Sequence, residues 1–335
     1  MEREVILAVD IGGSKYVAGL VAADGRVICK EKYLWSRMSA EQVTADIISA
    51  MERVIEEHPE MKISAVGMTI PGLADPETGM WISASFMGIY NLPIGEIVGR
   101  RFGLPVYIEN DCNACALAER MFGHCREAGD FLYLTVSNSI GGALFLNGEL
   151  YRGFKGNAGE VGLIHVDVGN GPDGPVRVAV EDCASGRGLA NGYLALKAGE
   201  REALPGASNA PGGGTEWCSL PVSVSCPVSG GAPGGVSIAR LAKEGEPAAR
   251  EAFRREGIYL GQAIAACCAV LDPEVVIIGG GLSLAYEHYR DALCEVLARE
   301  LHISTGAVPP VRPTALGYDG GLIGAAALVV RGMKR

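Results

Sequence analysis

Short apolar runs separated by glycine-containing turns make up the start of the chain. Residues 5–21, VILAVDIGGSKYVAGLV, hold two apolar runs on either side of Gly12 and Gly13. A third run follows Asp24–Gly25, a dipeptide that is typical of hairpin turns. The pattern therefore predicts three antiparallel strands joined by tight turns.

Helical periodicity replaces this pattern in several later segments. Val43, Ile47, Met51 and Val54 share one face of a predicted helix, and Ser39 with Gln42 forms a capping-box signature before it. Further helices are predicted after residue 111, from residue 247, where a proline suits the first turn, and at the small-residue C-terminus. This mixture of strands and helices indicates the α/β class.

The strand-and-turn pattern occurs twice, which predicts two similar halves. The first copy starts near Val5 and the second near Phe131, and each contains a Gly-Gly pair and then an Asp-Gly or Asn-Gly turn. Glycine turns expose N–H groups that can cradle phosphate oxygens, although neither copy has the spacing of a Walker loop or a Rossmann fingerprint. Gly12–Gly13 can also be read as a plain hairpin turn; Lys15 and the repeat favour a phosphate site.

Two aspartates are candidates for the chemistry. Asp10 ends the first strand, where it could orient a cation or its bound water. Asp111 lies between a predicted strand and helix, at the strand end where ligands of α/β sheets gather. Asn110 or Asp111 could equally cap the helix, and the two roles are compatible. Capping and the helix dipole are expected to keep the Asp111 carboxylate ionised, as a base in phosphoryl transfer requires.

A third glycine cluster follows the apolar run VVII. Gly279 to Gly281 leave the backbone bare there, so that an adenine or ribose could approach closely. The alternative is a tight turn from a strand into a helix. Alone, this cluster does not separate the two interpretations.

Composition and charge narrow the class of protein. Among 335 residues, 48% are hydrophobic, and the formal net charge of −10 disfavours binding to nucleic acid or to an anionic membrane. The acidic N-terminus does not read as a signal peptide, and no apolar run reaches the ~18 residues of a membrane span. The predicted location is the cytoplasm. The ten cysteines, among them Cys112 and Cys115, are expected to be buried free thiols.

One long segment has a composition of its own. Residues 198–237 are rich in Gly, Pro and Ser and lack a helical period, which predicts a long solvated loop. A lid, a partner site, or a small edge hairpin formed by CSLPVSVSC are the alternatives.

Several motifs, taken in order, resemble those of one known family. They are DIGGSK at 10–15, IENDCNACALAE at 108–119, GNAGEVG at 156–162, EDCASG at 181–186 and LDPEVVIIGGGLS at 271–283. Together they resemble the ROK family (repressors, open reading frames and sugar kinases), from about residue 7 to about residue 328. The resemblance implies the actin-like, RNase H-like ATPase fold, with two α/β domains and an active cleft between them. The expected domains are 1–118 with 312–335, and 119–311.

The resemblance also implies an activity. It is ATP- and Mg²⁺-dependent phosphorylation of a hexose or N-acylhexosamine at O6, as in the glucokinases, by a homodimer without nucleic-acid or membrane partners. Asp111 would be the general base, and the sugar contacts would be Asn110, Glu160, Glu181 and Gly72. Asp10 would hold Mg²⁺ through water. The implied ATP- and phosphate-binding residues are Asp10, Gly12, Gly13, Ser14, Lys15, Asn138, Ser139, Gly141, Gly142, Gly279, Gly280 and Gly281.

The chain departs from the family at three places. Leu163 stands where the family carries a zinc-binding His, and three cysteines are missing from the segment before Glu181, so no structural zinc is predicted. His165 could replace that His as a sugar contact or be a partly exposed strand residue. SNSIGG replaces the usual second phosphate loop, and Phe86 takes the place of a sugar-contacting Asn. The sugar is therefore left open.

Two alternatives to a kinase follow from the same motifs. A sugar-responsive repressor would carry an N-terminal helix-turn-helix, whereas the first strand here begins at about residue 5. A catalytically weakened sugar-binding protein is favoured by the altered loop and disfavoured by the acidic residues and the lysine that are kept.

Overall fold

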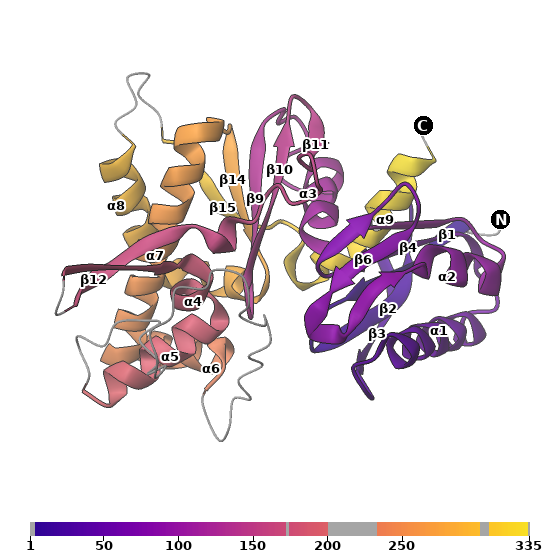
Figure 1. Ribbon diagram of the computed structural model, residues 1–335, viewed down its shortest axis with the longest axis horizontal. Coiled ribbons are helices and arrows are strands. Elements are labelled where there is room, and N and C mark those ends of the chain that lie inside the picture. The colour runs from indigo at the N-terminus through magenta and orange to yellow at the C-terminus, as the bar shows by residue number, and fades with distance from the viewer. Residues whose placement is uncertain (1–3, 172–173, 200–232, 302–307, 334–335) are drawn as a thin grey trace.

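The fold is built on two five-stranded sheets with the same strand order (Figure 1). The computed structural model describes residues 4–171, 174–199, 233–301 and 308–333. The first sheet has the order β3 (Val27–Leu34), β2 (Lys15–Val21), β1 (Glu4–Ile11), β4 (Lys62–Ile70) and β8 (Val106–Asn110). The second has the order β11 (Glu149–Tyr151), β10 (Ile140–Leu146), β9 (Phe131–Val136), β14 (Val275–Gly279) and β15 (Val311–Pro313).

In both sheets three antiparallel strands are followed by two parallel ones. The predicted internal repeat is thereby confirmed. The first hairpin turn is also as predicted, because Ile11 of β1 pairs with Tyr16 of β2 and the chain reverses through Gly12 to Lys15.

The second hairpin differs from the prediction of a Gly-Gly turn. Val136 pairs with Ile140, so residues 137–139 form the turn and both Gly141 and Gly142 lie inside β10. Close approach explains these two glycines: a Cβ on Gly141 would lie 2.6 Å from the Sγ of Cys112, and one on Gly142 would lie 2.8 Å from a backbone oxygen of the loop before residue 160. The glycines therefore serve contacts between elements and not chain reversal.

The helices follow the predicted periodicity. α1 (Ala40–Glu57) is capped by Ser39, whose side chain accepts the backbone N–H of Gln42, and α7 (Pro247–Leu271) has its proline in the first turn. The other α-helices outside the site are α2 (Ile94–Phe102), α4 (Val180–Ala184), α5 (Gly186–Lys197), α6 (Gly235–Glu244) and α8 (Arg290–Glu300). Two small antiparallel sheets complete the fold: β5 (Leu73–Asp75), β6 (Met80–Ala84) and β7 (Ile89–Leu92), and the pair β12 (His165–Gly171) and β13 (Gly174–Ala179).

Two helices lie between the sheets. α9 (Gly320–Gly332), at the end of the chain, packs on β1, β4 and β8, so the yellow C-terminal helix of Figure 1 lies beside the indigo first strands. α3 (Asp111–Phe122) packs against α9 and against β9 and β10. One apolar cluster therefore joins α3 to the second sheet as well as to α9. The division into domains near residue 118 stays a prediction.

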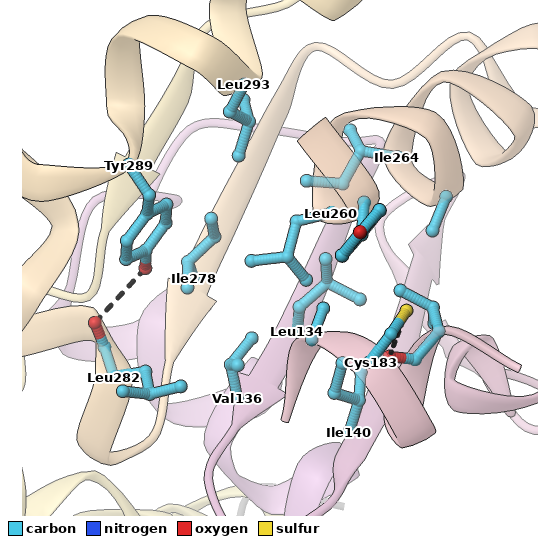
Figure 2. Packing of buried hydrophobic residues seen from close by; sticks show 14 of the residues in the cluster. Leu134, Val136, Ile140, Cys183, Leu260, Ile264, Ile278, Leu282, Tyr289 and Leu293 are labelled. Atoms are coloured by element: carbon cyan, nitrogen blue, oxygen red, sulfur yellow. Dashed lines mark hydrogen bonds between the residues drawn. The ribbon is translucent and has the colours of Figure 1, made fainter. Parts of the chain in front are cut away.

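The core of the second half is closed by helices over the sheet. Leu134 of β9 and Ile278 of β14 meet Leu260 and Ile264 of α7 (Figure 2). The Tyr289 hydroxyl, in the same cluster, donates to the Leu282 carbonyl at 3.2 Å, so this buried hydroxyl has a hydrogen-bond partner.

Two predictions from composition need correction. The segment 198–237 is not wholly a loop, because α6 begins at Gly235; residues 200–232, including CSLPVSVSC, lie outside the described residues. The cysteines within the described residues are free but not all buried, because Cys29 is half-buried on the outer strand β3 and Cys294 is exposed on α8. Within the described ranges, no helix is long and apolar enough to cross a membrane.

Candidate active site

Asp10 lies where the first sheet presents the carboxyl ends of its parallel strands. Residue 69 of β4 is its partner in the register, and the Thr69 hydroxyl donates to Asp10 Oδ1 at 2.7 Å. Burial raises the pKa of Asp10, while Thr69 and Lys15 oppose the rise. The N-terminal turn of α9 closes over this carboxylate, since a Cβ on Gly321 would lie 2.3 Å from it.

The turn after Asp10 keeps two backbone donors free. Gly12 donates its N–H to the Lys15 carbonyl at 2.9 Å, and its own carbonyl accepts the Trp35 indole N–H at 3.0 Å. Within the part of the chain that the structure describes, the N–H groups of Gly13 and Ser14 have no partner. The turn thus presents two adjacent donors and the Lys15 ammonium, which lies over the Tyr318 ring at 5.1 Å.

Phe86 covers part of this turn. A Cβ on Gly13 would lie 3.0 Å from the Phe86 ring, which is about half exposed. The Phe86 side chain therefore lies against the predicted phosphate loop.

Asn110 ends β8 and Asp111 opens α3, and the predicted capping role of this pair is present. The Asn110 side chain accepts the backbone N–H groups of Cys112 and Asn113, at 3.0 and 3.2 Å, and donates to the Gly72 carbonyl at 3.0 Å. Asp111 Oδ1 accepts the Cys112 N–H at 2.9 Å. Asn110 is thus the helix cap, and Gly72, another predicted sugar contact, is held directly against it.

The pKa of Asp111 depends on burial and a neighbouring charge as well as on the helix N-terminus. Burial and the neighbouring Asp10 carboxylate raise the pKa of Asp111 to about 6, although the Cys112 N–H opposes the rise. Desolvation therefore outweighs the cap in setting this pKa, but a carboxyl with a pKa of about 6 is still mostly ionised at neutral pH. A pKa near 6 still suits a base that works near neutral pH.

The second turn is braced by α5. The Ser137 carbonyl accepts the Gly186 N–H at 2.6 Å, and the Asn138 carbonyl accepts the Nε of Arg187 at 3.2 Å. Asn138 and Ser139 are exposed. Inside the turn, the Ser139 carbonyl accepts the Ser137 N–H at 2.9 Å.

The two predicted sugar glutamates lie near this turn. Burial raises the pKa of Glu181, and Glu160 adds to the rise through its charge, while Arg187 opposes it. Gly162, two residues after Glu160, lies against the backbone of Ile140 and the side chain of Glu181. The structure therefore brings Glu160 and Glu181 together beside the second hairpin.

Gly279 to Gly281 lie at the end of β14, next to the same hairpin. A Cβ on Gly280 would lie 2.4 Å from the Val136 carbonyl oxygen, and Gly280 has a φ of 76°. Gly281 starts a 3-10 helix, η3 (Gly281–His288), and a Cβ on it would meet nothing within 4 Å. The predicted turn from strand to helix is present, with open space at Gly281.

The residues at the missing zinc motif are solvent-facing. Leu163 is exposed in a short 3-10 turn, and His165, also exposed, has its Nδ1 3.1 Å from the Leu163 carbonyl oxygen. No group of three or more His, Cys, Asp or Glu is gathered as metal donors within the described ranges.

Several site residues escaped the sequence analysis. Thr69 lies inside β4, and its contact with Asp10 depends on which strands pair. Glu109 lies inside a motif that was singled out for its next two residues, and it forms an ion pair with Arg152 from the second sheet. Only a prediction of pairing between the two halves could have found that contact.

Comparisons with known proteins agree with this arrangement. The sequence profile described as ROK family matches residues 6–331. The bifunctional enzyme NanE/NanK of Brucella suis biovar 1 is 30% identical over 324 residues, which cover 96% of this chain and 53% of that protein. The chain therefore spans about half the length of that relative. Glucokinase of Thermotoga maritima is 28% identical over 335 aligned residues, with 98% of each chain covered.

A solved structure of similar length shares the fold. A ROK family glucokinase from Streptomyces griseus, in complex with glucose and AMPPNP, has a TM-score of 0.77 and 29% identity, and the match covers 97% of this chain and 98% of that one. The two repeated sheets are thus those of the actin-like ATPase fold. With the family profile matching nearly the whole chain, the protein belongs to the ROK family.

Proposed function

We propose that this protein is an ATP-dependent sugar kinase that phosphorylates a hexose or an N-acylhexosamine at O6. The observation that carries the proposal is the Asp10–Asp111 pair beside a turn with free backbone donors. Similarity to a glucokinase that was solved with glucose and AMPPNP supports the choice of substrates.

The nucleotide would be held at two glycine-containing regions. The N–H groups of Gly13 and Ser14, with the Lys15 ammonium, suit terminal phosphate oxygens because they are adjacent, unpaired donors. Asn138 and Ser139, with Gly141 and Gly142 behind them, would supply the second loop. The open backbone at Gly279 to Gly281 would take the adenosine.

Two close carboxylates fit a divalent cation. The charge of Asp10 makes ionisation of Asp111 less favourable, which a bound Mg²⁺ would relieve. Asp10 would hold the ion through water, and the ion would neutralise charge on the transferring phosphoryl group. No structural zinc is proposed.

Asp111 would act as the general base. One of its carboxylate oxygens is fixed by the Cys112 N–H, which leaves Oδ2 to take the sugar hydroxyl proton. The sugar oxygen then forms a bond to the γ-phosphorus as the bond to the ADP oxygen breaks, and the proton remains on Asp111. Asn110, Gly72, Glu160 and Glu181 would hold the sugar.

The remaining proposals concern context. We place the protein in the cytoplasm as a homodimer without nucleic-acid or membrane partners, and we keep the two-domain division given above. The sugar itself is left to experiment, because Phe86 and Leu163 put apolar groups where the family carries polar contacts.

ADP release with Mg²⁺-ATP and a panel of sugars tests this function. The panel is glucose, mannose, fructose, allose, N-acetylglucosamine and N-acetylmannosamine. Sugar-dependent release is expected with at least one of them. A sugar that binds without release would indicate instead a sugar-binding protein on the kinase fold.

A further inference from the structure

Glu109 is a buried carboxylate whose hydrogen-bonding capacity is fully used. It is 2% exposed and is the second-last residue of strand β8, directly before Asn110. Its Oε1 accepts the Asn110 backbone N–H at 3.0 Å and the Asn113 side-chain amide at 3.1 Å. Its Oε2 accepts the Nε of Arg152 at 2.8 Å, and a terminal nitrogen of the same guanidinium lies 2.6 Å away.

Arg152 comes from the other half of the molecule. It follows β11, at the edge of the second sheet, whereas Glu109 ends the outer strand of the first. Separating the pair would leave the buried Glu109 carboxylate without its charge partner, whereas the Arg152 side chain is about one-third exposed. The pair is therefore a fixed joint between the two halves.

Arg152 also starts the loop that leads to Glu160. The Arg152 carbonyl accepts the Ala158 N–H at 3.0 Å, which closes the loop on itself. A Cβ on Gly156 would lie 3.0 Å from the Leu73 side chain, next to the glycine whose carbonyl accepts the Asn110 amide. Gly159 is packed against the backbone of Gly142 in β10. The loop is thus pinned to the first half at two points and to the second sheet at one.

We propose that the Glu109–Arg152 pair is a positioning device that couples the first turn of α3, which carries Asp111, to the loop that carries Glu160. Neither residue is assigned contact with substrate. The inference rests on the proposed function only for its kinetic consequence. The coupling itself is a statement about two segments of the chain, and it can be measured without turnover.

Hydrogen exchange tests the coupling directly. In Arg152→Met, faster exchange is expected at the Ala158 amide and, on the other side of the joint, at the amides of Cys112 and Asn113. Arg152→Lys keeps the charge without the guanidinium and is expected to restore part of the protection. Arg240→Met, which removes an exposed arginine paired along α6, is the matched control and should leave both segments unchanged. Faster exchange confined to Ala158, or none, would overturn the inference.

Steady-state kinetics give the second readout. Misplacing the base relative to the sugar is expected to lower kcat/KM for the sugar on the order of 10²-fold while KM for ATP stays within about two-fold. Equal losses for both substrates would point to a merely structural role. If the wild type turns over no sugar, the proposed function fails and the exchange result alone decides the coupling.

A double variant guards against misfolding. The double variant Glu109→Gln, Arg152→Met leaves no unpaired buried charge, so it is expected to fold. It is still expected to show faster amide exchange in the loop that carries Glu160 and in the first turn of α3. A double variant that is folded and fully protected would contradict the proposal.

Discussion

Carboxyl groups with a raised pKa occur at two kinds of place in this protein. Asp111 has a hydrogen-bond donor, a helix N-terminus and a like charge beside it. Such surroundings are typical of a group that exchanges a proton. Glu256, inside α7, is 1% exposed, and both of its oxygens lack a partner among the described residues. Burial alone raises its pKa well above the ordinary value. The raised pKa of Asp111 therefore indicates a functional group, whereas the raised pKa of Glu256 indicates a buried carboxyl that lowers stability.

The pH dependence of activity follows from Asp111. Because the base must be deprotonated and its pKa is raised to about 6, kcat/KM for the sugar is expected to fall roughly tenfold per pH unit below about 6 and to level off above it. Asp10→Asn removes the repelling charge and is expected to move this limb to lower pH, whatever it does to the maximal rate. A pH–rate profile measured with both proteins checks the shift. An unmoved limb would mean that another group titrates.

Glu256 makes folding stability depend on pH. The folded protein keeps this carboxyl protonated while the unfolded chain ionises it near its ordinary pKa of 4.5. Stability is thus complete below about pH 4.5 and declines as the pH rises above that value. Glu256→Met is expected to raise the free energy of unfolding at pH 8 by roughly 1–4 kcal/mol, with a smaller gain at pH 5. Urea unfolding at both pH values measures this. Glu295→Met, on the exposed side of α8, is the control, and an equal change at both pH values would count against burial as the cause.

At the scale of elements, glycines mark where one element touches another. The Gly-Gly pair of the first hairpin turns the chain, whereas the same pair in the second lies in β10 against α3 and the loop before Glu160. The sequence predicts the strands and turns well because alternation and turn residues are local. It misplaces Gly141 and Gly142 because contact with another element, which is not local, decides their role.

The contact of Gly141 with α3 can be tested by adding a methyl group at Gly141 and then removing the sulfur of Cys112. Gly141→Ala would place a Cβ 2.6 Å from the Cys112 Sγ and is expected to cost about 1–3 kcal/mol of stability. Adding Cys112→Ala removes that sulfur, so the double variant is expected to recover most of the loss. Gly192→Ala, in open space on α5, should instead gain about 0.5–1 kcal/mol. Thermal or urea unfolding of the set gives the answer, and strictly additive effects would refute the contact.

At the scale of the whole molecule, the sequence predicts the repeat but not the contacts between the two halves. The repeat follows from two similar local patterns. Three contacts depend on which distant segments meet. They are Thr69 with Asp10, Arg152 with Glu109, and Glu119 with the segment that connects β15 to α9. Periodicity carries no information about such pairs, and with a single sequence nothing else supplies it.

Glu119 holds the chain segment that connects β15, in the second sheet, to α9, which packs on the first sheet. Its carboxylate accepts the Thr314 hydroxyl, the Ala315 N–H at 3.0 Å and the His124 N–H at 2.8 Å. Glu119→Ala would remove a buried carboxylate together with its three hydrogen bonds and is expected to lower the free energy of unfolding by about 3 kcal/mol. Denaturant unfolding measures this against Glu295→Ala, which should change little. A similar small effect for both would show that this connecting segment does not depend on the carboxylate.

The most direct test of the account is single-turnover phosphoryl transfer from Mg²⁺-ATP to the sugar, in the wild type and in Asp111→Asn, together with sugar binding by calorimetry. The account predicts that Asp111→Asn binds the sugar within a few-fold of the wild type and transfers the phosphoryl group at least ~100-fold more slowly. Transfer at the wild-type rate by the variant would contradict Asp111 as the base. Sugar binding without transfer by the wild type would contradict the kinase itself.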